Sequence, residues 1–244
     1  MKDNSIDYVE ALKRPFLNTK SVLVGTLLGI IPVVNFTVIG YTLASTGLSK
    51  EKVGKDTLPE WNDYIDLFKR GLVSVLIGII LFLPAALVLF GTIGSVILSP
   101  AMSMILGGLP IQSCEDLVAG QIPDTVMESW LAQNWTEFIP LLTNAAPFII
   151  LAVILGLAAL YIMPAAILGW LKEDNISAAF SMKTLKATMT LDYLVNWLIV
   201  GYLIGLVNSL FSWIPVLGVG ITMYVSGVFS YTVYSELFTR AETD

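Results

Sequence analysis

The stretch GLVSVLIGIILFLPAALVLFG, residues 71–91, contains no charged side chain, and it decides the fold class. It belongs to an uncharged run over 71–114, and three further uncharged runs cover 21–49, 138–171 and 193–235. A helix needs only about 20 apolar residues to cross a bilayer, and it satisfies its own backbone groups there. The sequence therefore predicts an all-α, polytopic transmembrane helical bundle.

The composition supports a membrane protein. Hydrophobic residues make up 56% of the chain and charged residues 13%, with a mean hydropathy of +0.79. Soluble domains carry about 25% charged residues. The apolar stretches are continuous rather than alternating, which disfavours a β-barrel. The net charge of −6 provides no basic patch, so nucleic acid is not expected as a partner. The N-terminus lacks the pattern of a cleaved signal peptide, so the first apolar run is expected to act as a retained anchor.

Two absences exclude most catalytic chemistry. The chain has one cysteine, Cys114, and no histidine. Intramolecular disulfides are therefore excluded, as are metal sites built from histidine or several cysteines. Catalytic triads and pairs that use histidine are excluded as well. We expect no catalytic, cofactor-binding or metal-binding residues, no cofactor, and no enzymatic activity.

The distribution of lysine and arginine predicts the orientation. Residues 1–20, 50–70 and 172–192 carry three or more basic side chains each, whereas 115–137 carries five acidic side chains and no basic one. Under the positive-inside rule, the three basic segments are cytoplasmic and 115–137 faces outward. Residues 1–244 are expected to form a single multi-pass domain of the cell membrane, with both termini in the cytoplasm.

These assignments predict about six membrane helices. Pro32 divides the first run into a hairpin of 16–31 and 34–49, which is either spanning or re-entrant. The second run crosses once, and its Gly/Pro-rich remainder, 92–110, is expected to be re-entrant or buried in protein. The third run crosses once and is punctuated by prolines. The fourth forms a hairpin that turns at Trp213–Pro215.

Amphipathic patterns in the cytoplasmic segments predict interfacial helices. In residues 59–70, apolar side chains recur at helical spacing, and we select Trp61, Asp63 and Asp66 as candidate interfacial residues. Residues 175–189 show a weaker pattern of the same kind. The N-terminal segment around Tyr8 shows a third.

A short pattern occurs twice and suggests an internal repeat. Its first copy is Gly25, Gly29 and Ile31-Pro32-Val33, and its second copy is Gly201, Gly205 and Ile214-Pro215-Val216. Repeats are common in transporter folds. The corresponding repeat units would be 7–110 and 138–237.

The chain resembles a family of polytopic archaeal and bacterial membrane proteins of unknown function. The likeness is carried by IIPVVN, GYTLAS and LPEWNDYIDLFKRGL, and by IMPAAILGWLKEDNISAAFSMKTL. The residues that match the family pattern are Gly40, Tyr41, Leu58, Pro59, Trp61, Asp63, Phe68 and Gly71. The likeness covers most of 15–237, and it implies a multi-pass prokaryotic membrane protein without implying an activity.

One acidic motif points to an enzyme. Asn62-Asp63-x-x-Asp66 resembles half of the aspartate-rich motif with which membrane prenyltransferases hold Mg²⁺ against a pyrophosphate. Arg70 stands where the next acid is expected, and 172–192 offers no second cluster. We therefore favour the other interpretation, in which these acids form the solvated face of an interfacial helix.

Glycines, prolines and amides within the apolar runs either pack helices or line a solute path. Glycine pairs permit close helix contact, and buried amides join helices by hydrogen bonds. Asn196 is one such amide. The other candidates for packing or path lining are Gly25, Gly29, Pro32, Asn35, Asn144, Gly201, Gly205, Asn208 and Pro215. The runs hold no ionisable acid or base, which disfavours a proton-coupled pump.

Three functions remain open. The first is a non-enzymatic membrane subunit, scaffold, or lipid- or partner-binding module, with membrane lipids and other membrane-protein subunits as partners. The second is a passive small-solute transporter or channel. The third is a membrane-embedded enzyme acting on lipid pyrophosphates, for which Asp63 and Asp66 would hold the metal.

Overall fold

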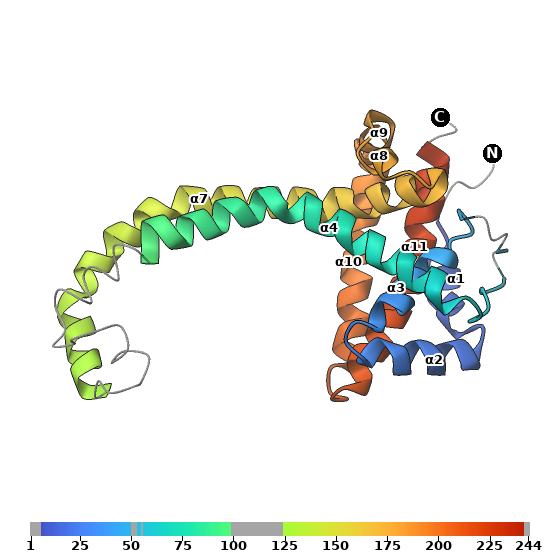
Figure 1. The fold of residues 1–244 in the computed structure, drawn as a ribbon, viewed down its shortest axis with the longest axis horizontal. Coiled ribbons are helices and arrows are strands. Elements are labelled where there is room, and N and C mark those ends of the chain that lie inside the picture. The colour runs from blue at the N-terminus through green and yellow to red at the C-terminus, as the bar shows by residue number, and fades with distance from the viewer. Residues whose placement is uncertain (1–5, 50–52, 55, 99–123, 242–244) are drawn as a thin grey trace. The chain divides into compact units, whose positions relative to one another are not determined.

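The computed structural model describes residues 6–49, 53–54, 56–98 and 124–241 (Figure 1). Within these ranges the chain is all helical and contains no strand, as the sequence predicts. The helices are α1 (Tyr8–Lys13), η1 (Arg14–Phe16), α2 (Thr19–Ile30), α3 (Asn35–Ala44), α4 (Tyr64–Thr92), a π-helical stretch (Ile93–Leu98), α7 (Asp124–Glu173), α8 (Ile176–Ala179), α9 (Met182–Thr188), α10 (Leu191–Phe211) and α11 (Leu217–Ala241). Of the segment 92–110 that was expected to be re-entrant or buried in protein, residues 92–98 are helical. Residues 99–110, Cys114 and the acidic residues before 124 lie outside the described residues.

Four helices are long and apolar enough to cross a membrane. They cover Tyr64–Val96, Ile139–Glu173, Leu191–Phe211 and Leu217–Ala241. The described chain is therefore that of a membrane-embedded protein. The two helices of the first apolar run, α2 and α3, are shorter than these four.

The chain divides into two compact units, and each is described by itself. Unit 1 contains Met1–Leu81 and Leu160–Asp244, and unit 2 contains Phe82–Ala159. The expected single domain over 1–244 and its internal repeat stay predictions.

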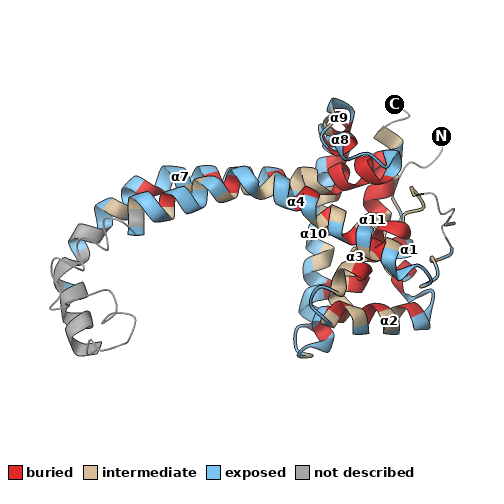
Figure 2. Ribbon diagram, viewed as in Figure 1, coloured by how far each residue is buried: buried red, intermediate tan, exposed pale blue. Residues whose placement is uncertain are grey.

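Helix α11 forms the centre of unit 1. It contacts α1, η1, α2, α3 and α10, and its side chains Tyr224, Val228 and Phe229 are fully buried. The buried residues concentrate along this helix and α3, whereas α10 presents a largely exposed side (Figure 2). Unit 1 thus buries one apolar helix inside the others and leaves apolar surface outside, as a protein in lipid requires.

Helices α3 and α4 cross in direct backbone contact. A Cβ atom on Gly40 would overlap the carbonyl oxygen of Leu67, and one on Gly71 would overlap the carbonyl oxygen of Phe36. The rings of Phe36 and Phe68 lie 5.8 Å apart beside this crossing. Only a residue without a side chain fits at either glycine.

The connection from α3 to α4 is held by Tyr41 and Trp61. Their rings stack at 3.9 Å with an interplanar angle of 4°. The Tyr41 hydroxyl lies 3.0 Å from Ser21 Oγ and donates to the carbonyl oxygen of Pro59 at 2.9 Å. The aromatic stack and these hydrogen bonds place the turn before α4 against α2 and α3.

Unit 2 buries small side chains at seven-residue intervals. These are Ala85 and Thr92 on α4, and Ala145, Ala152 and Ala159 on α7. Large apolar side chains such as Phe90, Ile154 and Leu157 are exposed. Small residues on the buried side of membrane helices allow the helices to approach closely.

One local prediction from the sequence is wrong, and two other segments differ in detail from what the sequence suggests. The separate amphipathic helix expected over 59–70 does not form, because the helix begins at Tyr64 and continues to Thr92 as α4. Asp63 stands before its first residue, and nothing in the sequence stops the helix near 71. The third run, expected to cross once, lies in the single helix α7, which continues through the prolines at 140, 147 and 164. Membrane helices tolerate proline when neighbouring groups satisfy the freed carbonyls. The pattern over 175–189 forms two short helices, α8 and α9, rather than one.

The two Ile-Pro-Val turns have the same backbone geometry. Val33 and Val216 both adopt positive φ angles, 72° and 65°. In the first turn Asn35 N donates to Ile31 O and Phe36 N to Val33 O. The second turn repeats both hydrogen bonds, between Gly218 and Ile214 and between Val219 and Val216. A positive φ is an outlier for a β-branched residue.

We therefore expect Val33→Gly to stabilise the protein by about 1 kcal/mol, because it removes strain of that order. The Val33 side chain is 61% exposed, so little packing is lost. Val34→Gly is the matched control, because Val34 has an ordinary φ of −66° and should lose stability. Thermal unfolding in detergent measures both variants. A loss with Val33→Gly as large as that with Val34→Gly would contradict the strained turn.

Candidate ligand-binding site

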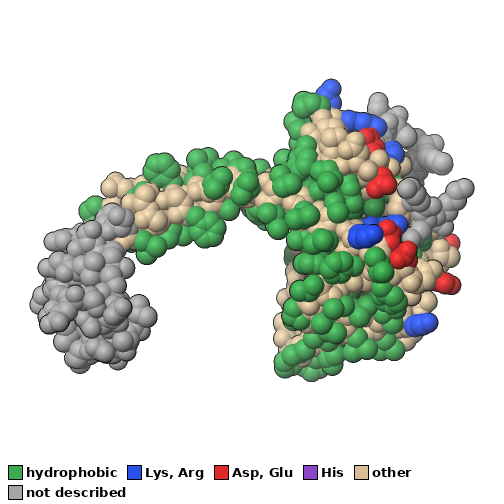
Figure 3. Space-filling model, viewed as in Figure 1, with side chains coloured by type: hydrophobic (Ala, Val, Ile, Leu, Met, Phe, Trp, Pro, Cys, Tyr) green, Lys and Arg blue, Asp and Glu red, His purple; other side chains and the backbone are tan. Residues whose placement is uncertain are grey.

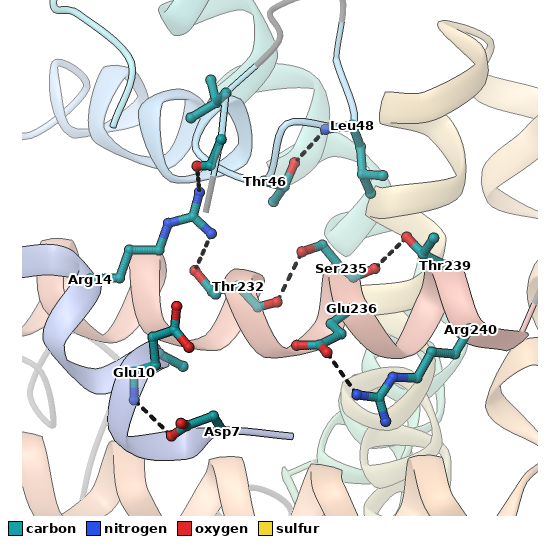
Figure 4. A pocket seen from close by; sticks show the side chains of 13 residues that line it. Asp7, Glu10, Arg14, Thr46, Leu48, Thr232, Ser235, Glu236, Thr239 and Arg240 are labelled. Carbon is teal, nitrogen blue, oxygen red and sulfur yellow. Dashed lines mark hydrogen bonds and ion pairs between the residues drawn. The ribbon is translucent and has the colours of Figure 1, made fainter. Parts of the chain in front are cut away.

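A polar pocket of about 460 Å³ lies in unit 1 between the N-terminal helix, the segment after α3, and the last turns of α11 (Figure 4). Its volume is in the range of small-molecule sites. The residues that line it are Asp7, Glu10, Ala11 and Arg14; Thr46, Leu48, Val53 and Gly54; and Thr232, Ser235, Glu236, Thr239 and Arg240. Ligand pockets are usually mostly apolar, so this lining favours a polar ligand.

The local sequence places these side chains on facing helix surfaces. On α11 the lining residues recur every three or four positions and so share one face. Helix α1 begins at Tyr8 because the Asp7 carboxylate accepts from the backbone N–H groups of Val9 and Glu10, both at 3.0 Å. Charged side chains gather near the ends of the chain in unit 1, whereas hydrophobic side chains cover α2, α3 and α10 (Figure 3).

Helix α1 is also tied to α10. The Tyr8 hydroxyl donates to Asn196 Oδ1, and Asn196 Nδ2 donates to the Asp192 backbone and carboxylate oxygens at 2.7 and 3.0 Å. Burial raises the pKa of Tyr8, and the charge of Asp192 raises it further. The amide of Asn196 thus joins two helices and orients the wall that carries Glu10 and Arg14.

Arg14 lines the pocket and is only 7% exposed. Its Nη2 donates to the backbone oxygens of Ser45 at 2.7 Å and Gly54 at 3.2 Å, and its Nη1 lies 3.5 Å from Thr232 Oγ1. Burial lowers the pKa of Arg14, whereas Glu10 and Asp56 raise it. The guanidinium stays charged, because arginine is not deprotonated in proteins. It therefore connects the N-terminal segment, the segment after α3, and α11.

The hydroxyl groups of the pocket all donate to backbone carbonyls three or four residues earlier in the chain. On α11, Ser235 Oγ donates to Thr232 O at 2.9 Å, and Thr239 Oγ1 donates to Ser235 O at 2.7 Å. Thr232 and Thr46 make the same kind of bond. The hydroxyl hydrogens are therefore used. The oxygens of Ser235 and Thr239 offer lone pairs to the pocket, whereas Thr46 Oγ1 already accepts from Leu48 N at 3.3 Å and Thr232 Oγ1 faces Arg14 Nη1.

The carboxylates of the pocket differ in how many of their oxygens already accept hydrogen bonds. Asp7 uses Oδ1 to cap α1. Glu236 Oε1 accepts from Arg240 Nη2 at 2.7 Å. Glu10 is exposed, and its carboxylate makes no hydrogen bond or ion pair within the described residues while pointing into the space between α1 and α11 (Figure 4). Glu10 is thus the acid most available to a ligand.

The two glycine pairs selected from the sequence have different surroundings in the structure. A Cβ atom on Gly29 would lie 3.0 Å from Gly220 Cα, and one on Gly25 would overlap the Tyr224 ring, so both glycines lie against α11. Within the described residues, no atom lies within 4 Å of a Cβ position on Gly201 or Gly205 of α10. In that part of the chain, only the first pair therefore packs helices together.

The other packing or path-lining candidates lie apart from one another. Pro32 and Pro215 stand in the two turns, and Asn144 and Asn208 are exposed on α7 and α10. The Oδ1 atom of Asn35 is buried and finds no partner in the described part of the chain. None of the nine candidates lines the pocket.

The candidate interfacial residues contact other side chains and backbone groups near the start of α4. Trp61 stacks on Tyr41. The Asp63 carboxylate accepts from Asp66 N at 3.0 Å and caps the helix, and Asp66 pairs with Arg70 at 2.6 Å. Within the described ranges, no three acidic or cysteine side chains gather as metal ligands.

The sequence interpretation did not select the pocket residues. A signal was present on α11, where hydroxyl and charged residues follow one face from Thr232 to Arg240. Arg14 carried no such signal, since it is one of several basic residues in the N-terminal segment, and only the fold buries it.

Comparison with known proteins finds one matching family. Residues 23–223 match the family described as "Protein of unknown function (DUF4013)", which covers most of the chain. This agrees with the resemblance to a family of unknown function. No curated protein matches the chain. No solved structure matches it either.

Proposed function

Because the chain belongs to the DUF4013 family of proteins of unknown function, we propose its function from the site itself. The protein is a multi-pass membrane protein that binds a small polar molecule or lipid headgroup in the Arg14 pocket. It acts as a non-enzymatic binding module. The observation that carries this proposal is a 460 Å³ pocket with polar walls, built on apolar helices.

The hydrogen bonding of the pocket supports binding rather than catalysis. A serine or threonine nucleophile needs an adjacent base to take its proton. Here the hydroxyls of Ser235, Thr239 and Thr232 donate to backbone carbonyls instead. The chain has no histidine to act as that base. Asp63 and Asp66 are occupied by a helix cap and an ion pair, so we propose no pyrophosphate chemistry there.

The proposed topology has four crossings and a re-entrant hairpin. Helix α2 has 12 residues and α3 has 10, which correspond to about 18 and 15 Å at 1.5 Å per residue. The hydrocarbon core is about 30 Å thick. Four crossings keep both termini in the cytoplasm, as the basic segments require. Membrane lipids would cover the exposed apolar side of α10, including Leu198 and Leu210.

Cysteine labelling tests this topology in a Cys114→Ser background. An impermeant maleimide added outside intact cells should label Ser129→Cys but neither Ile31→Cys nor Lys20→Cys. Ile31 lies at the turn between α2 and α3 and is 48% exposed. Labelling of Ile31→Cys from outside would show a spanning hairpin and restore six crossings.

Native mass spectrometry tests the binding module. The full chain, extracted in mild detergent and placed in nanodiscs, should carry a bound molecule of defined mass. Thr239→Trp should release it, because Thr239 is an exposed residue at the pocket and tryptophan would fill the space. Thr143→Trp is the matched control, since Thr143 is also exposed and makes the same i−4 hydroxyl bond. A bound molecule that survives Thr239→Trp, or none in the unmodified protein, would refute the proposal.

A further inference from the structure

We infer that the ligand of the Arg14 pocket carries an ammonium group. The inference rests on the proposed function, and it adds the chemical class of the ligand. It follows from the hydrogen-bonding capacity that the pocket residues leave unused after their contacts within the chain are counted.

The accessible hydrogen-bonding groups are mostly acceptors. The hydroxyl oxygens of Ser235 and Thr239 have donated their hydrogens to carbonyls and keep only lone pairs. The Glu10 carboxylate is unoccupied within the described residues. Asp7 uses one carboxylate oxygen in the α1 cap and Glu236 uses one in its pair with Arg240, which leaves each acid a second oxygen. An ammonium group has three donors and no acceptor, which complements these oxygens.

The two arginines are engaged within the chain. Arg14 directs Nη2 at two backbone carbonyls and Nη1 at Thr232, while its Nε has no hydrogen-bond partner within the described residues but is buried and so not accessible to a ligand. Arg240 is paired with Glu236. Three carboxylates therefore face two guanidinium groups, and both guanidinium groups have protein partners. The remaining charge of the lining is negative, which attracts a cation.

Glu10 is the residue that would contact the ammonium group. It lies on α1 between Asp7 and Arg14, and its carboxylate points toward the face of α11 that carries Thr232 and Ser235 (Figure 4). A charged hydrogen bond between ammonium and carboxylate is stronger than one between neutral groups. The pocket would hold the rest of the ligand against Ala11 and Leu48.

Calorimetric titration of the full chain in phosphatidylcholine nanodiscs tests the inference. The probes are putrescine, ethanolamine and inorganic phosphate. A second preparation in phosphatidylethanolamine nanodiscs tests the lipid as the source of the ammonium group, through its thermal unfolding temperature. Glu10→Gln removes the negative charge with little change in shape. Glu173→Gln is the control, since Glu173 is also exposed and lies outside the pocket.

A soluble amine should bind saturably, and Glu10→Gln should weaken its affinity at least tenfold. If the lipid is the source, phosphatidylethanolamine should raise the unfolding temperature, and Glu10→Gln should abolish that rise. Glu173→Gln should leave either effect unchanged. Saturable phosphate binding without amine binding would overturn the inference, as would an amine effect that Glu10→Gln leaves intact. In those cases the bound molecule in native mass spectrometry would persist, so the binding module would stand. Absence of a bound molecule from the unmodified protein would refute the proposed function instead.

Discussion

Replacing Gly40 with alanine is expected to destabilise the protein by about 3 kcal/mol, at the upper end of the range for overpacking. The new Cβ would overlap the carbonyl oxygen of Leu67. Because that atom belongs to the α4 backbone, no side-chain rotation can relieve the overlap, and α3 and α4 must separate. Thermal and denaturant unfolding in detergent measures the loss.

Gly201→Ala provides the control for this substitution. Gly201 also lies inside a helix, but no atom of the described part of the chain lies within 4 Å of its Cβ position. Alanine has the higher helix propensity by about 1 kcal/mol, so Gly201→Ala should keep or slightly raise stability. If Gly40→Ala were tolerated as well as Gly201→Ala, the close crossing of α3 and α4 would be wrong.

Arg14→Met is expected to destabilise the protein by about 3 kcal/mol, because it leaves the Ser45 and Gly54 carbonyls without their donor. The substitution keeps an unbranched side chain that can still pack in the same space. Each buried acceptor that loses its partner costs about 1–3 kcal/mol. Unfolding of the purified protein in detergent measures the change, and pocket binding should fall with it.

Two further variants separate charge from geometry at Arg14. Arg14→Lys keeps the charge without the planar fork, so it should recover only part of the lost stability. Lys13→Met removes an exposed neighbouring charge and should have no measurable effect. Equal stability for Arg14→Met and Lys13→Met would contradict the role of Arg14 as a buried connector.

The sequence predicted the class of fold because hydrophobic length determines membrane insertion. The uncharged runs correspond to the four candidate spans and to α2 and α3. Helix ends were predicted less well. Pro32 and Pro215 separate helices, whereas the prolines at 140, 147 and 164 lie inside α7. The difference depends on neighbouring groups that satisfy the freed carbonyls, and the chain sequence does not contain that information.

The candidate site could be predicted only in part. The polar face of α11 can be recognised in the sequence as a helical pattern. The opposite side of the pocket forms because α1 packs beside α11, and the sequence pattern does not show that contact. Asn196 was recognised as an amide within an apolar run, yet its partner Tyr8 is 188 positions away in the chain. Gly40 and Gly71 were noted only as parts of a family pattern, and the structure supplies the physical reason for both.

The most direct measurement of the central claim is an experimental density map of the purified protein in nanodiscs. We expect density for a bound molecule in the Arg14 pocket, within hydrogen-bonding distance of Glu10 and Ser235. We expect the same map of Thr239→Trp to lack this density. A pocket filled only by solvent in the unmodified protein, with α1 still packed on α11, would contradict the account.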